Sequence, residues 1–537
     1  MTDQDPVHDH SARPYGWVGA YSERRAALSP DAVGLRDASS GASFTYAELD
    51  RRANRTARLL SAHGVADGER VAVVSRNRPE LVDLFFGACK TGGVLAPLSH
   101  RLAPPEMGAL LDDVDPELLV VEAPFADDVA AALAHGNCGV DAPALALGTG
   151  GIAGRAEPDP DPVDSDLAAG DYAGALPEDD SPVETADLAL SDPALFLHTG
   201  GSTGVPKETV LTHGSVLWNS FNTITAWGLR PDDVTPMTFP MFHTGGWNVI
   251  TVPLFHVGGE VIVAREFDPA EVLGLVDETE ASLLIAVPAV LRMMADHDDW
   301  EEADLSTLRF VKSGGGPCRE RVMREWWERD VDLSQGYGLT ECGPNNFAMP
   351  EGWDRATADS VGVPAPHVDT RVVGDDGGEL DRGEIGELEL AGPHAADRYW
   401  RNPEESEATF GDGWVSTGDL ARVDEDGYHY VEGRKKNMYV SGGENVYPAE
   451  VEDAIADHPG VEEVVVVPVP DEQWGQVGRA VVQGDRTIDL ESLREFLDGR
   501  LARFKHPRSV AFVDEMPTSG PSKIDREAIK AEFGDEE

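Results

Sequence analysis

Residues 194–213 read ALFLHTGGSTGVPKETVLTH and carry the strongest signal in the sequence. The apolar run 195–197 predicts a buried strand, and a loop rich in glycine and hydroxyl groups follows it. Glycines let backbone N–H groups approach an anion, hydroxyl groups add donors, and a lysine adds positive charge. The loop therefore predicts a polyphosphate site made by Thr199, Gly200, Gly201, Ser202, Thr203, Gly204 and Lys207.

Taken alone, this loop leaves an alternative open, because an ordinary glycine-rich turn has a similar composition. It does not match the P-loop of nucleoside triphosphatases, in which Gly-Lys is followed by Ser or Thr. Here Val205 and Pro206 precede Lys207, and Glu208 follows it. Other parts of the chain must therefore decide the interpretation.

Four later stretches provide that decision: QGYGLTE (335–341), STGDL (416–420), GRKKNMYVSGGENVYPAEVE (433–452) and MPTSGPSKIDR (516–526). With the first loop, and in this order and spacing, they closely resemble the core motifs of the adenylate-forming enzymes. That family includes acyl-CoA synthetases, firefly luciferase and the adenylation domains of peptide synthetases. The resemblance covers nearly the whole chain, and five motifs in the right order argue against coincidence.

The resemblance implies a nucleotide site spread over several segments. The family's adenine loop corresponds to Gly314, Gly315, Gly316 and Pro317, where small residues leave room for a flat base. In QGYGLTE it implies that Tyr337, between Gly336 and Gly338, lies against adenine, that Thr340 contacts the α-phosphate, and that Glu341 binds magnesium, with Thr203 as a further metal ligand.

The ribose and the catalytic charges are assigned in the same way. Asp419 and Arg434 resemble the family's two ribose contacts, and a carboxylate can accept hydrogen bonds from both ribose hydroxyls. Lys436 stands at the family's hinge position, and Lys523 resembles its catalytic lysine. Gly442 and Gly443 of SGGEN would let the pantetheine arm of CoA pass close to the backbone.

The acyl channel is represented by PMFHTGGWN (240–248). The resemblance implies that His243 lines this channel, although a core histidine beside Phe242 is the alternative. Trp247 could also line it, but a buried tryptophan usually belongs to the core.

Four residues depart from the family pattern. Gly200 replaces a common serine, Asn437 the usual aspartate after the hinge, and Ser522 the usual glycine before the catalytic lysine. Glu208 replaces a common glycine, and its carboxylate would repel a triphosphate unless the side chain turns away.

Strands that alternate with helices predict an α/β fold with mostly parallel, doubly wound sheets. Thr45 and Glu48 form a possible capping box for one of these helices, and residues 94–98 read as one of the strands. We expect a large N-terminal domain over residues 1–435, with a β-rich subdomain that includes a hairpin at 370–390 and with an acidic surface loop at about 148–190. A small mobile α+β domain is expected over residues 436–537.

Charge is the unusual property of the composition: 98 acidic against 43 basic residues give a formal net charge of −55. Salt at molar concentration shortens the screening length to about 3 Å, so such a surface predicts a salt-adapted protein. Nucleic acid is excluded as a partner by this anionic surface. The four cysteines lack paired spacing, and the sequence shows neither a signal peptide nor a bilayer-spanning run, so we expect a cytoplasmic protein that is a monomer or a homodimer.

The predicted function is activation of a carboxylic acid with ATP and Mg²⁺ to acyl-AMP, followed by transfer to CoA. A fatty acid is the favoured substrate, because PMFHTGG and SGGENVYPAEVE resemble the fatty-acid branch of the family. A ligase for an aryl acid or for 2-succinylbenzoate is the alternative within the family. A catalytically silent adenylate-binding sensor is the alternative from another class.

Overall fold

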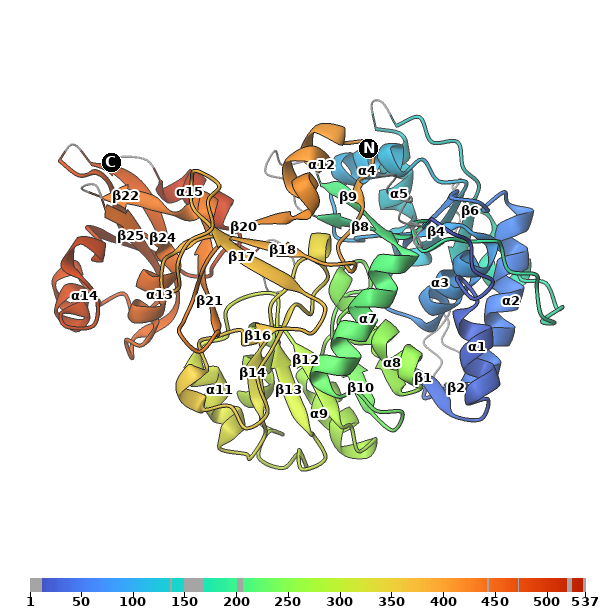
Figure 1. Cartoon of the computed structure of the whole chain (residues 1–537), viewed down its shortest axis with the longest axis horizontal. Helices are drawn as coiled ribbons and strands as arrows, with labels where there is room; N and C mark the ends of the chain where they lie inside the picture. The colour runs from blue at the N-terminus through green and yellow to red at the C-terminus, as the bar shows by residue number, and fades with distance from the viewer. Residues whose placement is uncertain are drawn as a thin grey trace, which may run out of the picture. The chain divides into compact units, whose positions relative to one another are not determined.

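The computed structural model describes residues 12–135, 138–148, 168–199, 206–441, 444–471, 473–518 and 524–534. The chain forms two compact units, each with its own sheets (Figure 1). Unit 1 comprises residues 1–353, 363–369 and 390–415, and unit 2 comprises residues 354–362, 370–389 and 416–537.

The first sheet of unit 1 has the strand order β19-β9-β8-β4-β3-β5-β6-β7. Strands β4, β3, β5, β6 and β8 run parallel, whereas β9 pairs antiparallel with both β8 and β19. The strands span β3 Arg70–Val74, β4 Val94–Leu98, β5 Leu118–Glu122, β6 Ala144–Leu147, β7 Ala168–Asp171, β8 Pro193–Thr199, β9 Lys207–Thr212 and β19 Arg398–Tyr399. The mostly parallel sheet is the one that strand–helix alternation predicted, and β8 delivers the predicted phosphate loop at its carboxyl end.

The second sheet of unit 1 has the order β14-β13-β12-β10-β11-β1-β2 and is parallel except for β2. Its strands span β1 Val33–Asp37, β2 Ser43–Thr45, β10 Val234–Met237, β11 Glu260–Val263, β12 Leu283–Ala286, β13 Phe310–Ser313 and β14 Leu333–Gln335. A two-stranded ladder of β15 Phe347–Ala348 and β16 Val363–Pro364 completes the unit.

Some helices of unit 1 begin at a side-chain cap. Thr45 and Glu48 form the predicted capping box at the start of α2 Tyr46–Ala62, and Thr212 caps α7 His213–Trp227. The other helices are α1 Tyr21–Leu28, α3 Pro79–Thr91, α4 Pro104–Val114, α5 Ala126–Leu133, α6 Tyr172–Ala175, α8 Thr251–Val257, α9 Pro269–Glu278, α10 Pro288–Ala295, α11 Glu320–Trp327 and α12 Pro403–Phe410. The predicted acidic loop therefore contains the short elements β7 and α6.

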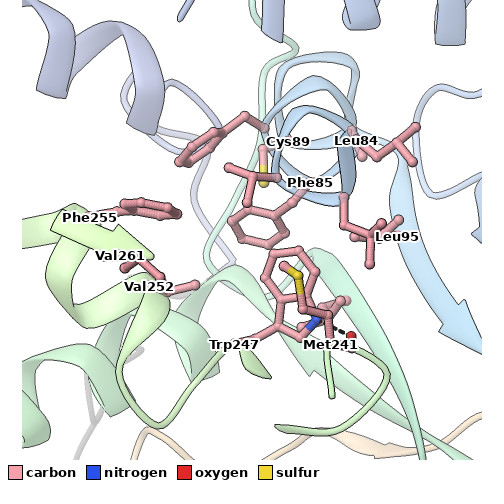
Figure 2. Packing of buried hydrophobic residues seen from close by; sticks show 14 of the residues in the cluster. Leu84, Phe85, Cys89, Leu95, Met241, Trp247, Val252, Phe255 and Val261 are labelled. Atoms are coloured by element: carbon pink, nitrogen blue, oxygen red, sulfur yellow. Dashed lines mark hydrogen bonds between the residues drawn. The ribbon is translucent and has the colours of Figure 1, made fainter. Parts of the chain in front are cut away.

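One hydrophobic cluster of unit 1 packs around Trp247, which has no exposed surface (Figure 2). Its ring lies 5.1 Å from that of Phe85, and its Nε1 donates to the carbonyl of Met241 at 2.6 Å. Trp247 is therefore a core residue and does not line an acyl channel.

Unit 2 contains a sheet in the order β17-β18-β20-β21, in which β20 and β21 pair antiparallel. Its second sheet has the order β23-β22-β25-β24, and β26 pairs with β25. The elements span β17 Asp369–Val373, β18 Gly386–Ala391, β20 Val415–Val423, β21 His429–Arg434, β22 Tyr439–Ser441, β23 Glu444–Val446, β24 Val461–Asp471, β25 Gly475–Gly484, β26 Ser509–Val513, α13 Pro448–Ala456, α14 Leu490–Leu497 and α15 Arg526–Phe533. The hairpin expected at 370–390 is β17–β18. Helix α14 ends at Leu497, because Asp498 is extended and Gly499 has a φ of +81°.

All four cysteines, Cys89, Cys138, Cys318 and Cys342, are free. No helix within the described ranges combines the length and apolarity needed to cross a bilayer.

Candidate active site

Two loops of unit 1 meet at one sheet edge because their strands are neighbours. Strands β13 and β14 pair in parallel with Ser313 opposite Gln335, and the N–H of Gly336 donates to the carbonyl of Ser313 at 2.7 Å. The predicted adenine loop follows β13, and the loop with Tyr337 follows β14. A Cβ placed on Gly314 or Gly316 would meet no atom within 4 Å, so the space beside this loop is open, as a flat base requires.

The loop after β14 is a tight turn that leads into the short 3-10 helix Thr340–Cys342. A Cβ on Gly338 would lie 2.2 Å from the carbonyl carbon of Pro344, so only glycine fits there. The backbone N–H of Asn346 donates to the carbonyl of Tyr337 at 3.1 Å, and the Tyr337 ring lies 5.8 Å from that of Phe347. Thr340 and Glu341 thus lie in a turn that is closed by the backbone hydrogen bond between Asn346 and Tyr337.

Glu341 is joined to Lys207 through a tyrosine that no motif had indicated. The hydroxyl of Tyr399, on β19, donates to Glu341 Oε1 at 2.8 Å. The Lys207 ammonium lies 5.1 Å from the centroid of the Tyr399 ring and forms an ion pair of 2.5 Å with Glu405. Burial, and next the nearby Glu341 carboxylate, raise the pKa of Tyr399, so its hydroxyl stays a donor. The structure therefore brings together Lys207 and Glu341, two of the residues that the motifs indicated.

The phosphate loop is bracketed by Thr199 and Lys207, which lie opposite each other in the β8–β9 ladder. Gly200, Gly201, Ser202, Thr203 and Gly204 lie outside the described residues, as do Gly442, Gly443 and Lys523. Pro206 and Lys207 are half-buried at the start of β9.

Glu208 is fully buried and turns into unit 1. Neither carboxyl oxygen has a hydrogen-bond partner within the described part of the chain. Burial, with a further contribution from Asp113, raises the pKa of Glu208 to about 8. The residue is therefore neutral near pH 7, which removes the repulsion of phosphate that its sequence position suggested.

Aromatic rings gather where β8 ends. We call His100, Phe125, His198, Phe242 and His243 the aromatic cluster. The Phe242 ring lies 4.5 Å from that of His243, 5.5 Å from His100 and 6.1 Å from His198, which it stacks against. His243 is exposed, whereas Phe242 and His198 are buried. His243 is therefore not a core histidine, and its ring lies 6.0 Å from that of His198, the residue before Thr199.

In unit 2, the two predicted ribose residues lie side by side. Asp419 on β20 and Arg434 on β21 are paired in register, and Nε of Arg434 lies 2.8 Å from Oδ1 of Asp419. A pocket of about 320 Å³ is lined by Gly418, Arg434, Lys435 and Lys436. Lys436 lies in the short helix Lys435–Asn437, and its ammonium forms a 3.1 Å ion pair with Glu527.

Comparison with known proteins agrees with this geometry. The family model for AMP-binding enzyme matches residues 22–400, and the model for AMP-binding enzyme C-terminal domain matches residues 450–523. The chain belongs to the AMP-binding enzyme family. It is therefore an adenylate-forming ligase, as the five motifs implied.

Relatives of this AMP-binding enzyme align over almost their whole lengths. A feruloyl-CoA synthase of Amycolatopsis sp is 37% identical over 96% of this chain and 99% of its own. An indoleacetate–CoA ligase of Aromatoleum aromaticum is 35% identical (96% and 97% covered), and the long-chain-fatty-acid–CoA ligase FadD13 of Mycobacterium tuberculosis is 32% identical (96% and 98%). The crystal structure of ATP-bound MatB from Rhodopseudomonas palustris has a TM-score of 0.85 at 31% identity, with 96% of this chain and 99% of that chain covered.

The donor set of this AMP-binding enzyme fits the magnesium that its family implies. Glu341 offers a carboxylate of which one oxygen already accepts from Tyr399. Mg²⁺ prefers oxygen ligands and retains several waters, so one carboxylate together with phosphate oxygens is a suitable set. Among the residues that the structure describes, no group of three or more His, Cys, Asp and Glu side chains could hold a metal without such help.

Sequence reasoning missed the segment 392–399, which carries Tyr399. Its sequence, GPHAADRY, matches no motif, its only charged residues are the neighbours Asp397 and Arg398, and β19 has only two residues. Only the folded structure shows that this segment belongs to the site. The N–H of Ala396 donates to the carbonyl of Glu341 at 2.9 Å, and the Tyr399 hydroxyl donates to the carboxylate of the same residue.

Proposed function

We propose that this enzyme activates a carboxylic acid with ATP and transfers the acyl group to CoA, and that its substrate carries an aromatic ring. The carboxylate oxygen attacks the α-phosphorus, the bond to the β-phosphate breaks, and pyrophosphate leaves. The thiolate of CoA then attacks the acyl carbon, and AMP leaves. One observation carries the choice of substrate: the exposed ring of His243 packs edge-on against the buried Phe242, which stacks on His198, the residue before Thr199.

The described residues support the first step through their charges. A carboxylate is a poor nucleophile toward a polyanion, so the site must neutralise charge and hold the reactants in line. We assign Lys207 to the phosphates, Thr340 to the α-phosphate, and Tyr337 to adenine. Glu341, and Thr203 outside the described residues, would hold magnesium, which supplies charge neutralisation at the phosphates when bound.

The remaining assignments complete the cycle. Asp419 and Arg434 are proposed to bind the ribose, with the Asp419 oxygens accepting from its hydroxyls. Lys523 is proposed to stabilise charge during adenylation, and Gly442 and Gly443 to pass the pantetheine arm. This proposal also includes a large domain at 1–435, a small domain at 436–537 and a hinge at Lys436. Rotation of the small domain would switch the active site from adenylation to thioester formation.

Two relatives support the aromatic substrate, since a feruloyl-CoA synthase and an indoleacetate–CoA ligase share 37% and 35% of their aligned residues with this chain. A fatty acid, which sequence reasoning ranked first, is the second candidate. The likeness to the long-chain-fatty-acid–CoA ligase favours it, at 32% identity.

The test is a panel of acids assayed for ATP–pyrophosphate exchange and for CoA thioester, with magnesium at molar KCl. Ferulate, indole-3-acetate, benzoate and 2-succinylbenzoate form one arm, and decanoate and palmitate the other. We expect a higher kcat/KM for the aryl arm, and the reverse order would assign the enzyme to fatty acids. If no acid supports exchange while ATP still binds, the protein is an adenylate sensor.

The lysine assignment has its own test. Lys523→Ala should abolish most exchange while thioester formation from supplied acyl-AMP persists, because the charge is needed only while phosphate charge is redistributed. Lys530→Ala, in α15, is the matched control. Equal losses in both half-reactions would contradict the assignment.

A further inference from the structure

Asn346 bridges the turn that presents Tyr337 and Glu341 through both its backbone and its side chain. Its backbone N–H donates to the carbonyl of Tyr337, and its side-chain amide nitrogen donates to the carbonyl of Gly343 at 2.8 Å. Asn346 is fully buried. Asn346 thus bonds to Tyr337, which precedes Glu341 in the turn, and to Gly343, which follows it.

Asn346 is in turn fixed by His394. Nε2 of His394 lies 2.7 Å from Oδ1 of Asn346. Because the amide nitrogen of Asn346 is used on Gly343, the oxygen faces the imidazole, and His394 must carry its proton on Nε2. The same nitrogen lies 3.4 Å from Sγ of Cys342, the residue after Glu341.

The imidazole cannot easily leave this place. His394 is 1% exposed, and a Cβ on Gly392 would lie 2.6 Å from its Cε1 and Nδ1. On the other side, a Cβ on Gly343 would lie 3.4 Å from its Cδ2, and Gly343 has a φ of +67°. The ring therefore occupies a slot between two glycines, and a side chain in place of Gly392 would collide with it.

The segment that carries His394 is anchored to the rest of unit 1. Ser215 Oγ, in α7, donates to the carbonyl of Ala395 at 2.7 Å, and the N–H of Ala396 donates to the carbonyl of Glu341. A donor held this rigidly can fix a turn to within the tolerance that catalysis requires, since a displacement of about 1 Å can cost about 10²-fold in rate.

We propose that His394 is a positioning residue for adenylate formation, which locks the Tyr337–Glu341 turn through its Nε2–H···Oδ1 bond to Asn346. The inference rests on the proposed function. His394 contacts Asn346 and Cys342 and acts through them on the residues assigned to the nucleotide.

Three variants test the proposal. His394→Leu removes the donor, His394→Gln places an amide nitrogen at the reach of Nε2, and His256→Leu is the control. Burial lowers the pKa of both His394 and His256 to about 4, but the His256 ring, on α8, packs on Tyr21 at 5.3 Å, away from the turn. The readouts are kcat and KM for ATP–pyrophosphate exchange, the Kd of ATP by calorimetry, and Tm.

We expect His394→Leu to lower kcat/KM for ATP by about 10²-fold and to leave KM for the acid unchanged. His394→Gln should recover kcat/KM to within about tenfold of wild type, and His256→Leu should lose Tm without this loss of rate. If His394→Leu does not fold, His394→Asn replaces it, because its amide is too short to reach Asn346. Equal kcat/KM in the His394→Leu and His256→Leu variants, or a glutamine variant as slow as the leucine one, would overturn the proposal.

Failure of the proposed function is recognised separately. It appears as wild-type protein that supports no exchange with any acid. In that case the Kd of ATP decides the inference, because a loosened turn should weaken ATP binding in His394→Leu but not in His256→Leu. An unchanged Kd would then overturn it.

Discussion

Tyr399 and Glu341, separated by 58 residues in the chain, are joined by a hydrogen bond of 2.8 Å from the phenol to the carboxylate. The tyrosine ring also lies beside the ammonium of Lys207. One side chain thus orients a proposed metal ligand with its polar tip and contacts a proposed phosphate ligand with its ring face.

Tyr399→Phe should therefore separate these two roles, because it removes the hydroxyl and keeps the ring. Loss of an outer hydrogen bond to a metal ligand costs about 10- to 100-fold in metal affinity, so the half-saturating Mg²⁺ concentration for exchange should rise about tenfold or more. Tyr430→Phe is the control, since its hydroxyl donates to Asp424 in unit 2. A Tyr399→Phe enzyme with the Mg²⁺ dependence of wild type would contradict the role of the hydroxyl.

Glu208 predicts a loss of stability as the pH rises from acid values to about 8. Its pKa is about 8 in the folded protein against an ordinary 4.5, so between these values the folded state holds a proton that the unfolded state has released. The contribution of this group to the free energy of unfolding is complete below pH 4.5. It falls as the pH rises from 4.5 through 8, by at most about 1.4 kcal/mol per pH unit. Glu208→Gln should flatten the dependence of Tm on pH between 6 and 8.5, whereas the exposed control Glu301→Gln should not.

A buried histidine predicts the opposite behaviour in acid. His213 has no exposed surface, neither ring nitrogen has a partner among the described residues, and burial lowers its pKa to about 4. The unfolded state, with a pKa near 6.5, binds the proton first, so stability is lost as pH falls from 6.5 to 4. We expect the free energy of unfolding in urea to fall less steeply toward acid pH for His213→Leu than for the exposed control His135→Leu. Equal losses of stability in the two variants would mean that burial does not lower the pKa of His213.

Much of the fold follows from local signals, and the site follows only in part. The Thr45–Glu48 capping box and the run 94–98 depend on neighbours in sequence, so α2 and β4 form as predicted. Asp419 and Arg434 were identified by motif, and the β20–β21 register makes them a pair. The burial of Glu208 and the slot around His394 arise from residues far apart in the chain, which no local pattern encodes.

Lys436 remains a predicted hinge, and its substitution tests that prediction. Lys436→Pro fixes φ and removes a backbone donor, so it should hinder rotation of the small domain. Acyl-AMP should form at the wild-type rate, and the CoA thioester should form more slowly. Lys436→Ala is the control, because it removes the ion pair with Glu527 but leaves φ free. If the proline variant makes thioester at the rate of the alanine variant, the hinge lies elsewhere.

The net charge of −55 predicts that salt stabilises the protein. Repulsion among surface carboxylates raises the free energy of the compact state, and added ions reduce that repulsion as the screening length shortens. Tm should rise from millimolar to molar KCl. The KM for ATP should fall as well, because long-range repulsion of the nucleotide weakens more than the short contacts of Lys207 and Arg434 do. A Tm that stays flat or falls would contradict salt adaptation.

The division of the chain between the two units has a consequence for synthesis. The chain passes between them at 353/354, 362/363, 369/370, 389/390 and 415/416. Strands β17 and β18 therefore leave the ribosome before β20 and β21, the strands that complete their sheet. During that interval, β18 presents an unpaired edge, which is a hazard for association with other chains. A nascent chain released after residue 415 should aggregate more than one released after residue 434, although the two differ by only 19 residues.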